Sequence, residues 1–118
     1  MQTEESITRT LVNGALLPQF QGKNVTIYGT VNGTNPKGDS FDIISTDKHL
    51  ITISMRRPLT EPVTGLIEIH GIVRDKNTVI CDYYMEFPKE IAESYEADLT
   101  NEVVKVIHAV PNIWANSL

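Results

Sequence analysis

The sequence predicts an all-β domain, a small closed barrel of five strands, followed by a C-terminal α-helix. Two observations predict this arrangement. Between residues 25 and 87, apolar and polar side chains alternate in short stretches that are separated by turn residues, which is typical of a small β-barrel. From Asp98 onward, apolar residues instead recur every three or four positions, which is typical of an amphipathic helix.

The size and charge of the chain limit what it can do. With 118 residues and 41% hydrophobic residues, the chain can form one modest core. The formal net charge of −5 disfavours strong independent binding to a polyanion, because such binding depends on Lys and Arg. Cys81 is the single cysteine, so no internal disulfide is possible.

The sequence suggests no secretion signal and no membrane span. The segment 1–10 is polar and acidic, and no apolar run approaches the ~20 residues that a membrane helix needs. We therefore expect an intracellular soluble domain, cytosolic or nuclear. Its parts are a flexible N-terminus at 1–10, a barrel domain at 11–97, and an oligomerisation helix with a tail at 98–118.

The barrel is expected to begin after a capping segment. Gly14 and Pro18 limit residues 11–20 to a helical turn, which we expect to cover one end of the barrel. The loop at 56–64 contains Pro58 and Pro62 and cannot form a long helix. The five strands are predicted around residues 25–31, 41–43, 49–55, 65–74 and 78–87. In the last strand, we expect Val79, Cys81, Tyr83, Met85 and Phe87 on one side.

Two glycines specify the type of barrel. Gly29 and Gly71 lie inside predicted strands, where glycine usually marks a bulge or a sharp bend in a barrel wall. Long first and fourth strands that bend at glycine are what an OB-fold requires. An SH3-like barrel of five shorter strands is the alternative.

The C-terminal helix has an unusually wide apolar surface. At ~100° per residue, its apolar side chains cover an arc of roughly 160°, although about 100° is enough for packing on one core. The arc therefore suggests two contacts, one with the barrel and one with something else, whereas the simpler interpretation is a deep groove in the chain's own fold. Asn101, Glu102, Lys105 and His108 are placed on the polar side. The apolar residues are Leu99, Val103, Val104, Val106, Ile107 and Val110, with Ile113 and Trp114 after the helix-ending Pro111.

Several stretches, in this order, resemble the small subunit of replication protein A, the trimeric eukaryotic single-stranded-DNA-binding complex. They span about residues 11–114. The matching stretches are Leu16-Leu-Pro-Gln-Phe20 with Val25 and Gly29, Arg57-Pro-Leu59, Gly65-Leu-Ile-Glu-Ile-His-Gly-Ile-Val73, Thr78-Val-Ile-Cys-Asp-Tyr-Tyr-Met-Glu-Phe87, and Asn101-Glu-Val-Val-Lys-Val-Ile-His108 followed by Pro111.

This resemblance implies a structural role in a nuclear complex for replication, repair and recombination. In that family, the C-terminal helices of the large, middle and small subunits form a three-helix bundle. The middle and large subunits are then the expected partners. The implied partner-binding residues are Leu99, Val103, Val104, Val106, Ile107, Val110, Ile113 and Trp114. The alternatives are a subunit of a telomere-specific complex built on the same plan, and an OB-fold module that binds nucleic acid alone.

A weak contact with single-stranded DNA is a further possibility. OB-folds stack bases on aromatic side chains in a basic groove, usually over their second and third strands. The candidate aromatics are Tyr28 and Phe41, and the candidate cations are Lys37, Lys48, Arg56 and Arg57. The alternative is that Phe41 belongs to the core and that the charges are solvated.

The sequence indicates no enzyme, cofactor or metal site. His49, His70 and His108 are scattered and lack the Cys–His spacing of zinc sites. No nucleophile elbow, P-loop or dinucleotide-binding fingerprint is present. Cys81 lies among strand residues, and the simplest interpretation is a small buried hydrophobic residue.

Overall fold

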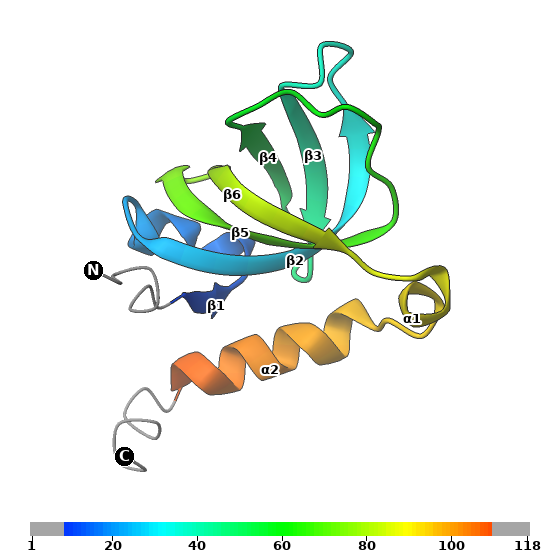
Figure 1. The fold of residues 1–118 in the computed structure, drawn as a ribbon. Helices are drawn as coiled ribbons and strands as arrows, with labels where there is room; N and C mark the ends of the chain where they lie inside the picture. The colour runs from blue at the N-terminus through cyan, green and yellow to red at the C-terminus, as the bar shows by residue number, and fades with distance from the viewer. Residues whose placement is uncertain (1–8, 110–118) are drawn as a thin grey trace, which may run out of the picture.

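The computed structural model describes residues 9–109, apart from the side chains of Asp98 and Ala109. Strands dominate the first part of this range and helices the last (Figure 1). The elements are β1 (Thr10–Val12), the 3-10 helix η2 (Gly14–Phe20), β2 (Asn24–Thr34), β3 (Ser40–Ser45), β4 (Leu50–Met55), β5 (Leu66–Asp75), β6 (Thr78–Glu86), α1 (Lys89–Glu93) and α2 (Ala97–Ala109).

The strands form a closed barrel, as predicted. The strand order is β1-β2-β3-β4-β6-β5, and an additional pairing of β2 with β5 closes the sheet. Strand β2 is long enough to pair with β5 through its first part and with β3 through its second. Strands β2 to β6 are the five strands of an OB-fold barrel, which confirms the predicted fold class with its C-terminal helix.

Strand β1 is an element that the sequence analysis did not predict. Its three residues pair in parallel with β2, with Thr10 opposite Val25 and Val12 opposite Ile27. Three residues are too few to show an alternating pattern. Thr10 therefore belongs to the folded body rather than to the flexible N-terminus predicted for residues 1–10, of which residues 1–8 lie outside the described range.

Gly71 allows a bulge in β6, as its position inside a strand suggested. His70 pairs with Tyr83 and Gly71 pairs with Cys81, so Asp82 is the extra residue on β6. A Cβ atom on Gly71 would lie 2.1 Å from the Ile80 carbonyl oxygen, which explains why glycine is needed there. This close approach of the two backbones is possible only without a side chain at residue 71.

The bulge corrects the predicted orientation of the last strand. An extra residue reverses the inward and outward alternation beyond it. Cys81 is buried before the bulge, whereas Tyr83 and Met85 are exposed after it. Tyr84 packs against the core instead.

The core fills the barrel interior with branched aliphatic side chains and one aromatic ring. Leu17 of η2 is fully buried among them, so this helix contributes to the core. Phe41 is also fully buried, and its ring meets the Tyr84 ring edge to face at 6.4 Å. The buried core members are Val12, Leu17, Val25, Ile27, Phe41, Ile43, Ile51, Ile53, Val63, Ile67, Ile69, Val73, Val79 and Cys81.

Asp47 joins the β3–β4 turn to the start of η2. Its carboxylate accepts hydrogen bonds from the backbone N–H groups of Gly14 and Ala15, each at 2.9 Å, and from the Ser45 hydroxyl. Burial alone would raise the pKa of Asp47, but these hydrogen bonds and the nearby His49 ring hold that pKa below its usual value.

Candidate functional site

Helix α2 lies along one end of the barrel and is reached from β6 through α1 (Figure 1). Its barrel-facing side combines one buried aliphatic side chain with polar ones. Val104 is 0% exposed. Asn101 and His108, which the sequence analysis placed on the polar side of the helix, make contacts with the barrel.

Asn101 is the central polar contact between the helix and the barrel. Its Oδ1 accepts a hydrogen bond from the Asn13 side-chain amide at 2.8 Å and another from the Thr46 hydroxyl at 3.1 Å. Asn13 also caps η2, because its own Oδ1 accepts a hydrogen bond from the Leu16 backbone N–H. Directional hydrogen bonds of this kind fix the position of α2 along the barrel more closely than apolar packing alone.

His108 makes a second polar contact near the end of α2. Its Nε2 lies 2.9 Å from the Leu11 carbonyl oxygen, so this nitrogen carries the proton that it donates. The His108 ring also meets the Phe20 ring edge to face at 5.7 Å. The helix is therefore held near both ends of its described length, by Asn101 and by His108.

The opposite side of α2 carries an exposed apolar stripe, which we define as Leu99, Val103 and Val106. These side chains are 63%, 48% and 60% exposed, respectively. At ~100° per residue, they lie within about 60° of one another around the helix axis. Lys105 and Glu102 form an ion pair at 3.0 Å on one flank of the stripe.

The predicted partner-binding residues differ in how far they are buried. The stripe residues are exposed, Ile107 is half-buried, and Val104 is buried against its own barrel. Val104 therefore belongs to the barrel contact and not to the predicted partner-facing set. Val110, Ile113 and Trp114 lie outside the described residues.

The predicted DNA-contacting aromatics do not form a stacking surface. Phe41 points into the core, so the prediction that it could stack on a base is wrong. Tyr28 is half-buried, and its ring meets the Phe87 ring edge to face at 6.1 Å, near α1. On the outer face of β3 and β4, the Asp42 carboxylate accepts a hydrogen bond from Thr52 at 3.1 Å.

The predicted cations are also dispersed. Lys37 lies in the β2–β3 loop and Lys48 in the β3–β4 turn, at opposite ends of β3. Arg56 forms an ion pair with Asp82 at 2.9 Å, and Asp82 forms another with Arg9 at the same distance. Arg57 is exposed just after β4. These positions do not form one basic groove, so the predicted DNA contact stays a prediction.

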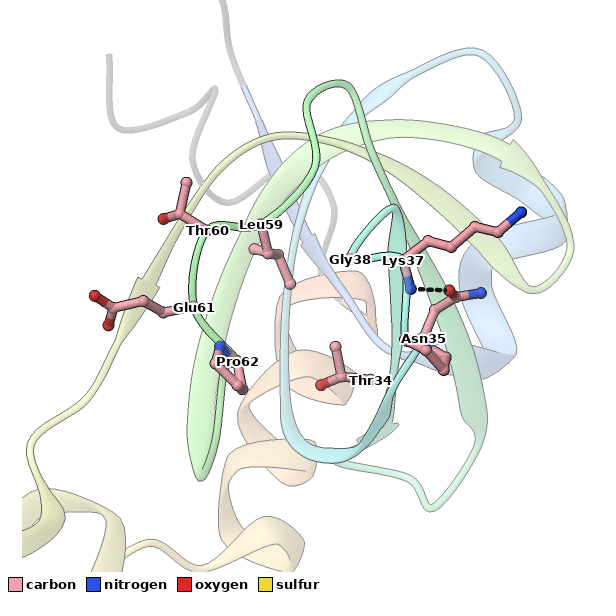
Figure 2. A pocket seen from close by; sticks show the side chains of 9 residues that line it. Thr34, Asn35, Lys37, Gly38, Leu59, Thr60, Glu61 and Pro62 are labelled. Carbon is pink, nitrogen blue, oxygen red and sulfur yellow. Dashed lines mark hydrogen bonds between the residues drawn. The ribbon is translucent and has the colours of Figure 1, made fainter.

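A surface pocket of about 340 Å³ separates the β2–β3 loop from the β4–β5 segment (Figure 2). The loop is fixed by the Asn35 side chain, whose Oδ1 accepts a hydrogen bond from the Lys37 backbone N–H at 2.7 Å. Gly38, with φ of 76°, accepts a hydrogen bond from the Leu59 N–H at 2.8 Å. Lys37 is among the lining residues, and its side chain points away from Leu59 and Pro62 (Figure 2).

Arg9 and Asn101 are the important residues that the sequence analysis did not single out. Arg9 donates hydrogen bonds to Asp82 and to the Gly71 carbonyl oxygen, at 2.9 and 3.1 Å, and so anchors β1 at the bulge. A signal existed for Asn101, because asparagine is unfavourable inside a helix unless its side chain has a partner. No comparable signal existed for Arg9.

The Cys81 thiol lies in surroundings that lower its reactivity. Burial, together with the Asp82 charge, raises the pKa of the Cys81 thiol to about 11, so it stays protonated at neutral pH. Within residues 9–109, no three His, Cys, Asp or Glu side chains are grouped so that they could hold a metal ion. None of the described helices is long and apolar enough to cross a membrane.

Comparison with known proteins identifies the family and the fold. The structure is similar to a chain of U. maydis replication protein A bound to single-stranded DNA, with a TM-score of 0.73 and 23% identity over 89% of this chain and 94% of that chain. It is also similar to the telomere capping protein Ten1 from S. pombe, with a TM-score of 0.65 and 13% identity over 86% of this chain and 99% of that one.

A chain of the S. pombe Stn1–Ten1 complex has the same fold, with a TM-score of 0.63 and 12% identity over 86% of this chain and 93% of that one. At such low identities, these likenesses establish the fold alone. The sequence itself matches the family described as Replication factor A protein 3 over residues 1–114. This match, which covers nearly the whole chain, agrees with the resemblance in the strands and the C-terminal helix. The chain belongs to the Replication factor A protein 3 family.

Proposed function

We propose that this chain is a structural subunit of a heterotrimeric single-stranded-DNA-binding complex, joined to its partners through α2. The observation that carries the proposal is the exposed stripe of Leu99, Val103 and Val106 on a helix that the barrel already holds in place. Isolated exposed hydrophobic side chains are common, but three on one side of a fixed helix form a surface for a partner helix.

The proposed assembly is a bundle of α2 with the C-terminal helices of a middle and a large subunit. Helix packing of this kind buries apolar side chains and keeps charged residues at the edges. The ion pair of Lys105 and Glu102 lies at such an edge. Val110, Ile113 and Trp114 would extend the same interface beyond the described residues.

The chain would support DNA binding mainly by holding the subunits together. The net charge of −5, the burial of Phe41 and the dispersed cations all disfavour tight autonomous binding to a single strand. The complex would act in DNA replication, repair and recombination, and the chain would then be nuclear. Any contact through Lys37 or Arg57 would be auxiliary.

A telomere-specific complex is the second candidate, favoured by the similarity to Ten1 and to the Stn1–Ten1 complex. Both candidates use one type of subunit, so the shape of the barrel does not distinguish them. Affinity purification of the full chain from its native cells, followed by mass spectrometry, would do so. Recovery of general replication subunits supports the first candidate, and recovery of telomere proteins alone supports the second.

The test of assembly is light scattering of the full chain mixed with the middle-subunit homologue from the same genome. The unchanged chain should shift to the mass of a complex, whereas Val103→Asp should remain monomeric, because burying an unpaired charge is costly. Thr60→Asp is the matched control, because it places the same side chain at an exposed position of the β4–β5 segment, outside α2. A Val103→Asp variant that assembles normally would overturn the proposal.

A further inference from the structure

A second pocket lies between the outer wall of the barrel and the junction of α1 with α2. Tyr28, Leu66 and Phe87 line it from the barrel, and Ile91, Tyr95 and Thr100 line it from the helical segment. Its volume is about 210 Å³, which is below the ~300–1,000 Å³ of typical small-molecule sites. The size suits one large apolar side chain.

The chemistry of the pocket also favours an apolar occupant. Most of its lining consists of aromatic and aliphatic side chains. The Ser94 hydroxyl donates to the Ile91 carbonyl oxygen at 3.0 Å, and the Thr100 hydroxyl donates to the Glu96 carbonyl oxygen at 3.1 Å. Both hydroxyl protons are therefore already used within the chain. A polar occupant would lose its hydrogen bonds to water without gaining these donors.

The pocket lies on one side of the exposed stripe, in a direction in which an interface on the stripe can extend. The three stripe residues offer roughly 300 Å² of surface, against the ~800 Å² per partner of a stable interface. Around the circumference of α2, Val103 of the stripe is followed by Ile107 and then by Thr100, which lines the pocket. Ile91, on the pocket wall, is itself 51% exposed.

The charge around the pocket indicates the kind of partner. Glu90, Glu93 and Glu96 are exposed at this junction, and α1 carries Lys89 as its one cation. Among the described residues, no cation lies within salt-bridge distance of these three carboxylates. An acidic surface repels nucleic-acid phosphates and attracts a protein segment that carries Lys or Arg.

We propose that this pocket receives one large apolar side chain from a basic segment of the partner subunit that packs on the stripe. The inference rests on the proposed function, because the same partner occupies both surfaces. The apolar side chain would anchor the segment, and the three glutamates would pair with the Lys or Arg residues next to it. The pocket would thus set the lateral position of the partner, which a stripe of three side chains defines poorly.

Calorimetric titration of the full chain with the middle-subunit homologue tests the inference. Ser94→Phe fills the pocket from its edge and should raise Kd at least tenfold. Thr60→Phe adds the same ring at an exposed position outside this pocket and should leave Kd unchanged. The double change Glu90→Gln and Glu93→Gln should weaken binding at low salt and flatten its salt dependence, and it decides the matter if Ser94→Phe does not fold.

The outcomes separate this inference from the proposed function. If Val103→Asp abolishes binding while Ser94→Phe and the double glutamine variant bind normally, the pocket inference is wrong and the proposed function stands. If Val103→Asp also binds normally, both fail. A photoreactive benzophenone side chain at residue 94 should crosslink to an apolar residue of the partner. Crosslinks only to residues 110–118 of the same chain, or to a second copy, would overturn the inference.

Discussion

The side-chain amide of Asn13 donates a hydrogen bond to Oδ1 of Asn101 at 2.8 Å, across 88 positions of the sequence. The segment that precedes the barrel is thereby joined directly to the helix that follows it. The same oxygen accepts a hydrogen bond from Thr46, so three separate parts of the chain meet at one amide group. This junction orients the side of α2 that remains exposed.

Replacing Asn101 with Ala should loosen the helix without unfolding the barrel. The change removes the acceptor for both Asn13 and Thr46 and should cost about 1–2 kcal/mol. Amide hydrogen exchange should accelerate in α2 and remain unchanged in β5. Asn32→Ala, at an exposed position of β2, is the control. Unchanged exchange in α2 would show that Val104 and His108 hold the helix without Asn101.

The stability of the protein should fall at acidic pH in part through Asp47. Its pKa is lowered in the folded protein, so its contribution is present above the unfolded value near 3.8 and is lost as the pH falls through the folded value. Denaturant unfolding of the unchanged chain and of Asp47→Asn should differ at pH 6 by about 1–2 kcal/mol. The difference should shrink as the pH falls below 4. A constant difference across this range would contradict the assignment.

Lys48→Gly should stabilise the fold. Lys48 has φ of 68°, a left-handed conformation that favours glycine over residues with a side chain. The gain should be about 1 kcal/mol, reduced by the greater flexibility of glycine in the unfolded chain. Thermal unfolding measures it, with Lys76→Gly in the β5–β6 turn as the control. A lower melting temperature for Lys48→Gly would show that the lysine side chain makes a compensating contact.

Gly71→Ala should be strongly destabilising. The added Cβ would lie 2.1 Å from the Ile80 carbonyl oxygen, a backbone atom that cannot move without disturbing the β5–β6 pairing. Overpacking of this kind costs about 3 kcal/mol. Gly33→Ala is the matched control, because no other atom lies within 4 Å of its added Cβ. Equal urea midpoints for the two variants would contradict the proposed role of Gly71.

The Cys81 thiol should resist alkylation in the folded protein. The thiol is buried and its pKa is raised to about 11, so little thiolate exists at pH 8. Iodoacetamide should modify it much faster in 6 M urea than in buffer, as mass spectrometry would show. Rapid labelling under native conditions would mean that β6 opens readily from the barrel.

The sequence was sufficient to predict the elements in which the pattern of apolar and polar side chains repeats several times. The alternation in β2, β4 and β5 and the helical spacing in α2 predicted these elements to within a few residues. The parallel strand β1 was too short to produce such a signal. Gly71 indicated a bulge or a bend, but it did not indicate that the extra residue is Asp82 of the partner strand β6, so the reversal beyond Asp82 was not predicted.

The candidate site was harder to predict, because the contacts of α2 were assigned to its apolar side alone. Asn101 and His108 are polar, yet they face the barrel, where Thr46 and the Leu11 carbonyl oxygen supply their partners. Periodicity predicts the width of an apolar arc, but the fold decides which part of the arc is covered. Phe41 shows the same limit. Inward and outward residues alternate along its strand, but the alternation alone does not show which set faces the core.

The polar contacts of α2 and β1 also have a consequence for synthesis on the ribosome. Arg9 contacts Asp82 across 73 positions, and Leu11 contacts His108 across 97. The backbone partner of β1, strand β2, is synthesised early. The contacts with Asp82 and His108 can form only after those later residues have emerged. Contacts so distant in sequence make folding slow, and until then the growing chain exposes unpaired strand edges. The anchoring of β1 at the bulge and the docking of α2 should consequently be late steps of folding.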